Sequence, residues 1–352
     1  MITIKKLSRI IIVCCCMIYT THNGFSQNNL TVENIAQINT QLFCLTTATD
    51  TIHFIKHDTI NRKKPLFLFM TGSLAMPLII DYGKDHKNAM ATNFYHLLDK
   101  QIFENFNVVS ISQPNVPPIV LSEDLNERGA YKNANPMFFK RNVSETYVER
   151  TNEVLNYLLQ QNWIDADSIY IFGHSQGAYI AARVPAENEA VKAIGFASTN
   201  PFGRLQGIMF KEARAKAISG EMTEEEAQKI IEQHWNLWNY MIYSPTFPDE
   251  WIGKTDLPAT QISFTQPVVD ILANLKQPVF IAYGTRDYHS VPCELLPIYF
   301  GFAKKTNYKM HPMLGRGHNF ETIDNDGKPN WDDMKWQEVT VEFMKFVREQ
   351  TE

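Results

Sequence analysis

Short apolar runs and amphipathic segments alternate along most of this chain. Five runs are rich in β-branched and aromatic residues, which predicts buried strands over 64–70, 106–111, 168–172, 191–197 and 278–284. Weaker patterns indicate edge strands near 41–45 and 51–57 and a last strand over 306–313. Between the runs, apolar residues recur at helical spacing over 89–100, 144–161 and 331–350. This alternation is typical of a mostly parallel sheet covered on both faces, so the sequence predicts an α/β fold.

The stretch 201–272 interrupts the alternation of strands and helices. It has no strong strand pattern; 210–219 has helical character, and a capping box at 223–226 precedes apolar residues at helical spacing. A similar capping box at 142–145 marks the start of one of the helices above. We interpret 201–272 as a helical cap or lid inserted into a single domain that covers 27–352.

The N-terminal segment has the features of a signal peptide rather than of the fold. An apolar stretch of ten residues at 10–19, too short to span a bilayer, follows the basic residues Lys5, Lys6 and Arg9. The sequence therefore predicts a signal peptide at 1–26. It also predicts export to the periplasm or outside the cell, with no stable membrane span after cleavage. A lipoprotein signal and a retained anchor are the alternatives.

Composition narrows the class of protein further. The chain has 352 residues, 44% of them hydrophobic and 20% charged, and a net charge of −5. Because its lysines and arginines are not clustered, nucleic acid is not an expected partner. Outside the signal segment only Cys44 and Cys293 remain, so one disulfide could form. The sequence has no phosphate-binding glycine loop and no clustered metal ligands, so we expect no cofactor and no metal.

The segment 173–177, with the sequence Gly-His-Ser-Gln-Gly, is the most specific chemical signal in the chain. It directly follows the apolar run 168–172 and precedes a helical segment. Between a strand and a helix, this pattern is typical of a nucleophile elbow, a sharp turn that exposes the central serine hydroxyl. Ser175 is therefore the candidate nucleophile, and an ordinary strand-to-helix turn is the alternative. We interpret His174 as supporting structure.

A serine hydroxyl needs a base to accept its proton and an acid to orient that base. Such groups collect at the carboxyl ends of parallel strands. Asp287 directly follows a predicted strand and is the candidate acid, and His318, in the loop before the final helix, is the candidate base. His289 and His311 are rivals. The first is only two residues from Asp287, and the second lies inside a predicted strand.

Acyl transfer also requires N–H donors for the developing oxyanion. The backbone N–H of Gln176 is one candidate, because it follows the nucleophile. The second is expected from the loop at 71–74, where we favour the backbone N–H of Ser73 over that of Leu74. Both roles belong to the main chain, so the chemistry does not constrain these side chains.

Three side chains are weaker candidates for substrate binding. Trp235 and Trp238, at helical spacing in the predicted cap, could line an acyl pocket, although aromatic residues at this spacing more often belong to a core. Arg286, next to the candidate acid, could bind a substrate carboxylate or phosphate. Arg316, close to the candidate base, could bind such a group as well. Such arginines more often pair with neighbouring acids.

These features resemble the α/β-hydrolase superfamily over nearly all of 60–350. The resemblance is carried by 173–177, by Gly-Thr-Arg-Asp at 284–287 and by Gly-His at 317–318. Similar members are esterases, lipases, thioesterases and some peptidases. The resemblance implies a mostly parallel central sheet with helices on both faces and a helical cap. One departure is Thr71-Gly72, where the oxyanion loop usually has His-Gly.

The leading hypothesis is an exported serine hydrolase that cleaves a carboxylic ester through an acyl-enzyme intermediate, with Ser175, His318 and Asp287 as its triad. A thioesterase and a small serine peptidase or aminopeptidase are alternatives on the same fold. A catalytically silent binding protein is an alternative from another class. The expected partner is a small ester or a short acyl or peptide substrate, and the oligomeric state stays open.

Overall fold

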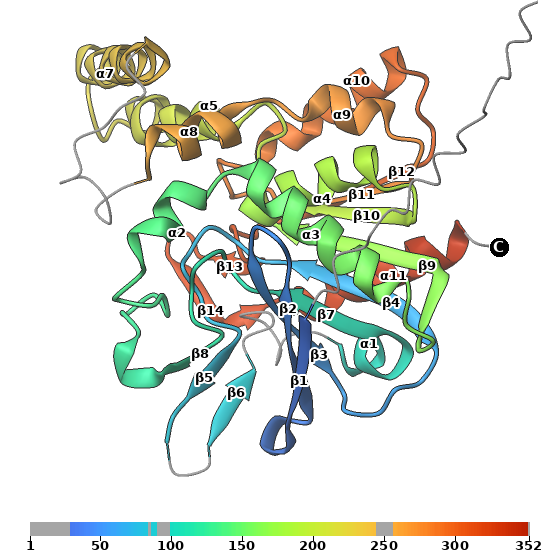
Figure 1. Cartoon of the computed structure of the whole chain (residues 1–352). Helices are drawn as coiled ribbons and strands as arrows, with labels where there is room; N and C mark the ends of the chain where they lie inside the picture. The colour runs from blue at the N-terminus through green and yellow to red at the C-terminus, as the bar shows by residue number, and fades with distance from the viewer. Residues whose placement is uncertain (1–28, 84–85, 90–98, 244–255, 351–352) are drawn as a thin grey trace, which may run out of the picture.

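Nine strands pair into one central sheet in a computed structural model of the chain, which describes residues 29–83, 86–89, 99–243 and 256–350 (Figure 1). In spatial order the strands are β1 (Asn29–Ile35), β2 (Thr40–Thr46), β3 (Thr51–His57), β7 (Asn107–Ile111), β4 (Lys64–Met70), β9 (Ile164–His174), β10 (Val191–Ala197), β11 (Val279–Gly284) and β12 (Tyr308–Met313). Pairing is antiparallel from β1 to β7 and parallel from β7 to β12. The predicted α/β class is confirmed, and β1 is an additional edge strand.

Alternate side chains of the central strands enter two separate apolar clusters. In β4, Leu66, Leu68 and Met70 belong to one cluster. Phe67 and Phe69 belong to the other. Successive residues of a strand point to opposite faces of the sheet, and here both faces are covered. This is why the strands are continuous apolar runs in the sequence rather than alternating patterns.

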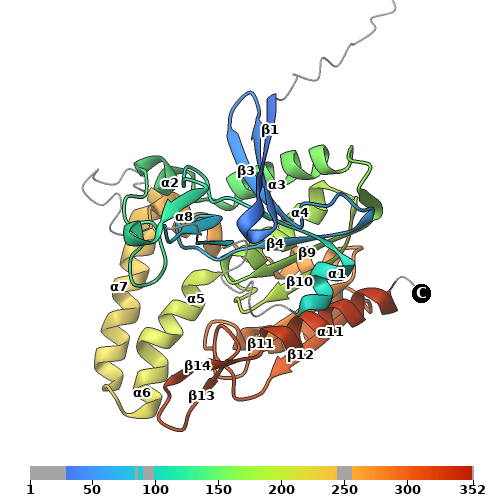
Figure 2. The same cartoon turned by 90° about the horizontal axis from the view of Figure 1, so that it is seen from below.

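Helices cover both faces of the sheet (Figures 1 and 2). The first face carries α3 (Ser144–Leu158) and α4 (Gln176–Glu187), and the second carries α1 (Lys100–Asn105) and α11 (Trp336–Glu349). The other helices are α2 (Pro136–Arg141), α5 (Arg204–Met209), α6 (Ala215–Ser219), α7 (Glu224–Tyr243), α8 (Pro258–Thr265), α9 (Val269–Asn274) and α10 (Leu296–Phe302). The remaining strands are β5 (Ile79–Asp81), β6 (Lys87–Ala89), β8 (Ile119–Leu121), β13 (Glu321–Ile323) and β14 (Pro329–Met334).

Two predicted helices have different bounds in the structure. The closing helix was expected to start at 331, but α11 begins at Trp336, because β14 pairs with β13 just before it. Of the helix expected over 89–100, residues 90–98 lie outside the described residues. Ala89 is the last residue of β6, and Lys100 is the first residue of α1.

The two predicted capping boxes have opposite outcomes. The one before α7 is confirmed, because the Thr223 N–H donates to Glu226 Oε2 at 2.8 Å and the Glu226 N–H donates to Thr223 Oγ1 at 3.2 Å. The one at 142–145 is wrong. Val143 is the N-cap of α3, and its apolar side chain cannot accept a hydrogen bond. The side chains of Asn142 and Glu145 instead accept from Gln176 and Ser263.

The described part of 201–272 is helical, as its pattern predicts. It carries α5, a π-helical turn at Phe210–Arg214, and then α6, α7, α8 and α9, and no strand is found within its described residues. Both views show α5, α7 and α8 together at one side of the sheet, with α7 the outermost (Figures 1 and 2). Because α5 begins shortly after β10 ends, the first residues of α5 lie near the carboxyl ends of the parallel strands.

Cys44 and Cys293 are free thiols in the structure, so the disulfide considered from the sequence is not formed. Cys44 lies in β2, whereas Cys293 is buried and its Sγ lies 3.2 Å from the carbonyl oxygen of Thr199. Among the helices in the described ranges, none combines the length and the apolar character needed to cross a bilayer.

Candidate active site

Ser175 lies in a sharp turn between β9 and α4. Its backbone has φ 55° and ψ −124°, a conformation that L-residues rarely adopt and that costs roughly 1–3 kcal/mol. The flanking glycines make this turn sterically feasible. A Cβ on Gly173 would lie 2.2 Å from the carbonyl oxygen of Gly177, and one on Gly177 would lie 2.2 Å from that of Met70. Only glycine permits this approach of strand and helix.

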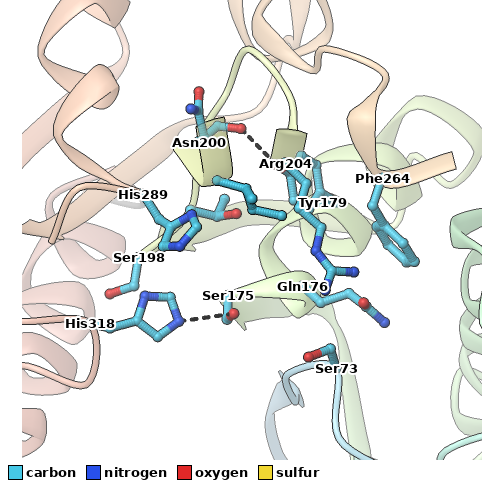
Figure 3. A pocket seen from close by; sticks show the side chains of 12 residues that line it. Ser73, Ser175, Gln176, Tyr179, Ser198, Asn200, Arg204, Phe264, His289 and His318 are labelled. Carbon is cyan, nitrogen blue, oxygen red and sulfur yellow. Dashed lines mark hydrogen bonds between the residues drawn. The ribbon is translucent and has the colours of Figure 1, made fainter. Parts of the chain in front are cut away.

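The structure brings Ser175, His318 and Asp287 into one chain of hydrogen bonds. His318 Nε2 lies 3.0 Å from Ser175 Oγ (Figure 3), and His318 Nδ1 lies 2.8 Å from Asp287 Oδ2. Asp287 follows β11 and His318 follows β12, so both come from the carboxyl ends of parallel strands, where functional groups collect. The arrangement lets the imidazole accept the serine proton while the carboxylate holds the other ring nitrogen.

The electrostatics of the acid–base pair favour the charged forms of both partners. Burial raises the pKa of Asp287, but the charge and the hydrogen bond of His318 outweigh burial and lower it below its ordinary value. Burial lowers the pKa of His318, but the charge of Asp287 and its hydrogen bond outweigh burial and raise it. The carboxylate therefore stabilises the imidazolium that forms when His318 accepts a proton.

The other histidines near the site have different surroundings. His174 Nε2 lies 2.9 Å from the carbonyl oxygen of His318, and burial lowers the pKa of His174 to about 3. His174 is thus a neutral support for the loop that carries the candidate base, as the sequence suggested. His311 stacks on Phe280 within the sheet. His289 lines the cavity beside Ser175, with its ring centroid 6.2 Å from that of His318.

The two expected oxyanion donors lie beside the nucleophile. The N–H of Gln176 belongs to the first turn of α4, where backbone N–H groups lack an intrahelical partner. Ser73 lies in the loop after β4 and lines the same cavity as Ser175 (Figure 3). A Cβ on the preceding Gly72 would lie only 3.8 Å from Ser175 Cβ, so this loop runs directly alongside the nucleophile. Leu74 does not line this cavity, but together with Ser73 it lines a second cavity of about 170 Å³ on the side of Ser175 that faces the loop after β4.

A chain of side-chain hydrogen bonds connects the two segments that carry these donors. Gln176 Nε2 donates to Asn142 Oδ1 at 2.8 Å, and the Tyr147 hydroxyl lies 3.0 Å from the same oxygen. The Tyr147 hydroxyl also contacts Gln113 Oε1, and Gln113 Nε2 donates to the carbonyl oxygen of Gly72 at 2.8 Å. The network fixes the start of α4 relative to the loop after β4.

A small polar cavity of about 200 Å³ opens beside Ser175. Its wall includes residues that the sequence did not single out: Tyr179, Ser198, Asn200, Arg204 and Phe264 (Figure 3). One signal could have found Arg204, because it follows β10 by a few residues at the end of the sheet that carries the site.

Trp235, Trp238 and Arg286 do not line this cavity. The tryptophans belong to α7, the outermost helix of 201–272, and Trp235 is 52% exposed. Arg286 is exposed, because the chain turns the neighbouring Asp287 inward to His318. Arg316 pairs with Asp333 at 2.9 Å, as such arginines more often do.

Comparison with known proteins identifies the fold alone. No protein-family model and no curated protein matches the sequence. The structure of DcsB in complex with its substrate analogue aligns with a TM-score of 0.51 and 14% identity, covering 88% of this chain and 99% of DcsB. A putative dipeptidyl aminopeptidase IV from Bacteroides ovatus aligns with a TM-score of 0.50 and 10% identity over 93% of this chain.

The chain spans only part of some of these proteins. It covers 36% of the Bacteroides ovatus protein. It covers 61% of the 2,6-dihydroxy-pseudo-oxynicotine hydrolase, which aligns over 79% of this chain with 12% identity and a TM-score of 0.47. The order and direction of the strands, together with the two neighbours that align with TM-scores of 0.51 and 0.50, show the α/β-hydrolase fold.

Replacing Asp287 by Asn should lower the pKa of His318. The raised pKa depends on the carboxylate, and without it burial alone acts in the opposite direction. In the unfolded chain, the pKa of His318 is about 6.5, and in the folded protein it is higher. The ion pair with Asp287 therefore contributes its full stabilisation below about pH 6.5, and this contribution is lost as the pH rises through the folded-state pKa of His318. An NMR titration of the imidazole measures the shift. Asp326→Asn, on an exposed turn, is the control, and an unchanged His318 pKa in Asp287→Asn would contradict the assignment.

Replacing Tyr147 by Phe should reduce the free energy of unfolding by about 1–3 kcal/mol, because the buried oxygens of Asn142 and Gln113 lose the one hydroxyl proton that lies between them. Tyr157→Phe is a matched control on the same helix. Its half-buried hydroxyl has no hydrogen bond to any described residue, so we expect a change near zero. Urea unfolding of both variants measures the difference. Equal stabilities would show that the network does not hold the fold together.

Proposed function

We propose that the protein is a serine hydrolase that cleaves a small carboxylic ester through an acyl-enzyme intermediate. The observation that carries the proposal is the hydrogen-bonded chain Ser175–His318–Asp287 at the wall of a cavity. The strained backbone of Ser175 supports it, because such strain collects at functional sites. The small volume of the cavity favours a short acyl group over a long one.

In the first half-reaction, Ser175 Oγ attacks the carbonyl carbon of the ester while His318 Nε2 accepts the hydroxyl proton. Asp287 stabilises the imidazolium. The carbonyl oxygen becomes an oxyanion and accepts hydrogen bonds from the backbone N–H groups of Gln176 and Ser73. The tetrahedral intermediate then collapses, the C–O bond to the alcohol breaks, and His318 gives its proton to the leaving oxygen.

In the second half-reaction, water enters beside the acyl-enzyme. His318 takes a proton from this water as its oxygen attacks the acyl carbon, and a second oxyanion forms in the same place. Its collapse breaks the bond to Ser175 Oγ, which recovers the proton from His318, and the carboxylic acid leaves. The steps use only side chains and backbone amides of the chain, so the proposal includes no cofactor.

We also propose that the protein is exported, on the basis of the N-terminal sequence alone. Residues 1–26 lie outside the described residues. If export is correct, expression of the full gene product in a bacterial host should yield a mature chain that begins at Gln27 in the periplasm or the medium. N-terminal sequencing of the fractionated protein measures this. An intact N-terminus in the cytoplasmic fraction would contradict the proposal.

Replacing Ser175 by Ala should reduce hydrolysis of p-nitrophenyl acetate and butyrate by a factor of about 10³–10⁶. Ser219→Ala, at the exposed end of α6, is the matched control and should keep wild-type activity. A serine-directed fluorophosphonate should label the wild type and not Ser175→Ala. Equal rates in the two proteins would remove Ser175 from the mechanism.

The same assays separate the alternative functions. Turnover of an aminoacyl p-nitroanilide without ester turnover would favour a peptidase, and turnover of an acyl thioester alone would favour a thioesterase. A wild type that turns over none of these substrates and takes no phosphonate label would favour a silent binding protein.

A further inference from the structure

Arg204 places a positive charge in the cavity beside the nucleophile. It is the first residue of α5, which begins shortly after β10, and it lines the same cavity as Ser175. Figure 3 shows its guanidinium group extending toward Gln176, on the side of the cavity that faces Ser73. A charged group in this position is within the wall that a molecule bound in this cavity meets.

The guanidinium of Arg204 is only partly engaged by the protein. Its Nη1 lies 2.7 Å from Asp256 Oδ2, and no other described residue forms an ion pair or a hydrogen bond with this side chain. A guanidinium has five N–H donors in a planar fork, so one carboxylate contact orients the group and leaves other donors for a ligand. Asp287, the candidate acid, is already paired with His318.

The wall beside Arg204 supplies further polar groups. The buried hydroxyl of Ser198 has no hydrogen-bond partner among the described residues, and Ser198 has a positive φ of 51°. The Tyr179 hydroxyl donates to the carbonyl oxygen of Asn200 at 2.8 Å, which fixes the chain between β10 and α5. Phe264 and Ile208 supply the apolar part of the wall. The cavity is therefore built for a short molecule with a polar, negatively charged end.

We propose that Arg204 binds a carboxylate of the substrate, and that the substrate class is the half-ester of a short dicarboxylic acid. The inference deepens the proposed function and rests on it. The planar fork of Arg204 matches the two oxygens of a carboxylate, and the cavity is small enough that one short chain joins that carboxylate to the ester at Ser175. Arg204 then selects the charged ester over a neutral one of the same shape.

The test compares monoethyl succinate with ethyl butyrate, a neutral ester of similar size. The wild type should prefer the half-ester in kcat/KM, and Arg204→Gln should reduce this preference at least about tenfold, chiefly through a higher KM for the half-ester. Arg204→Lys should restore part of the preference, because it keeps the charge without the fork. Arg286→Gln is the matched control. It removes one positive charge near the site from an exposed residue that does not line the cavity, and it should leave the preference unchanged.

A second measurement does not depend on turnover. Calorimetric titration of Ser175→Ala with monoethyl succinate should show binding that is lost in the Ser175→Ala, Arg204→Gln double variant. Melting temperatures of the variants establish that they are folded. Inorganic phosphate is titrated in parallel, and tighter binding of phosphate than of the half-ester would overturn the carboxylate assignment.

The outcomes separate the two proposals. The role of Arg204 is wrong, and the proposed esterase stands, if ethyl butyrate is hydrolysed through Ser175 as efficiently as monoethyl succinate. The same conclusion follows if Arg286→Gln changes the preference for the half-ester as much as Arg204→Gln does. If neither ester is hydrolysed and no phosphonate label forms, the esterase is wrong. The calorimetric titration then still decides whether Arg204 binds a carboxylate.

Discussion

The close backbone contact between the start of α4, at Gly177, and the end of β4 is the constraint on which the site depends. The Cα of Gly177 lies so close to the end of β4 that a Cβ there would meet the carbonyl oxygen of Met70 at 2.2 Å. This contact presses the start of α4 against the strand that leads into the loop of Ser73. Gln176 and Ser73 are thereby both held at the wall of the cavity beside Ser175. A larger residue at 177 would separate these elements and remove the geometry even if every side chain of the site remained.

The strained backbone conformation of Ser175 persists because hydrogen bonds from the surrounding elements hold it in place. The Ser175 N–H donates to the carbonyl oxygen of Ala197 at 2.9 Å, and the Ala178 N–H donates to the carbonyl oxygen of Ser175 at 3.0 Å. On the opposite side, His174 holds the loop of His318 through its imidazole. Each contact contributes only a net 0.5–1.5 kcal/mol or so. Together they balance an unfavourable conformation that costs a similar amount.

The parts of this architecture that follow from local pattern could be predicted, and the parts that depend on tertiary partners could not. The strand runs, Ser175, Asp287 and His318 were predictable, because each functional residue directly follows an apolar strand or its loop. The network through Tyr147 joins segments distant in sequence, and no local signal connects them.

Two errors have the same origin. The helical spacing of Trp235 predicts which residues share its helix face. It does not predict what that face packs against, and α7 lies too far from the cavity to reach it. The pattern at 142–145 satisfies the composition of a capping box, but Ser144 and Asn142 find better partners in Ser263 and Gln176. In both cases tertiary contacts outweigh the local rule. Arg204 was not predicted, although it follows β10 at the end of the sheet that carries the site.

The spacing of the site along the chain also bears on the order of folding. Ser175 and His318 meet across 143 positions, and His318 follows β12, the last strand of the central sheet. A chain is synthesised from its N-terminus, so the elbow can form well before the histidine is available. Until β12 joins the sheet, Ser175 has no contact with His318. In the proposed mechanism, activation of Ser175 therefore reports completion of the fold, and a partly assembled chain carries an inert precursor of the site.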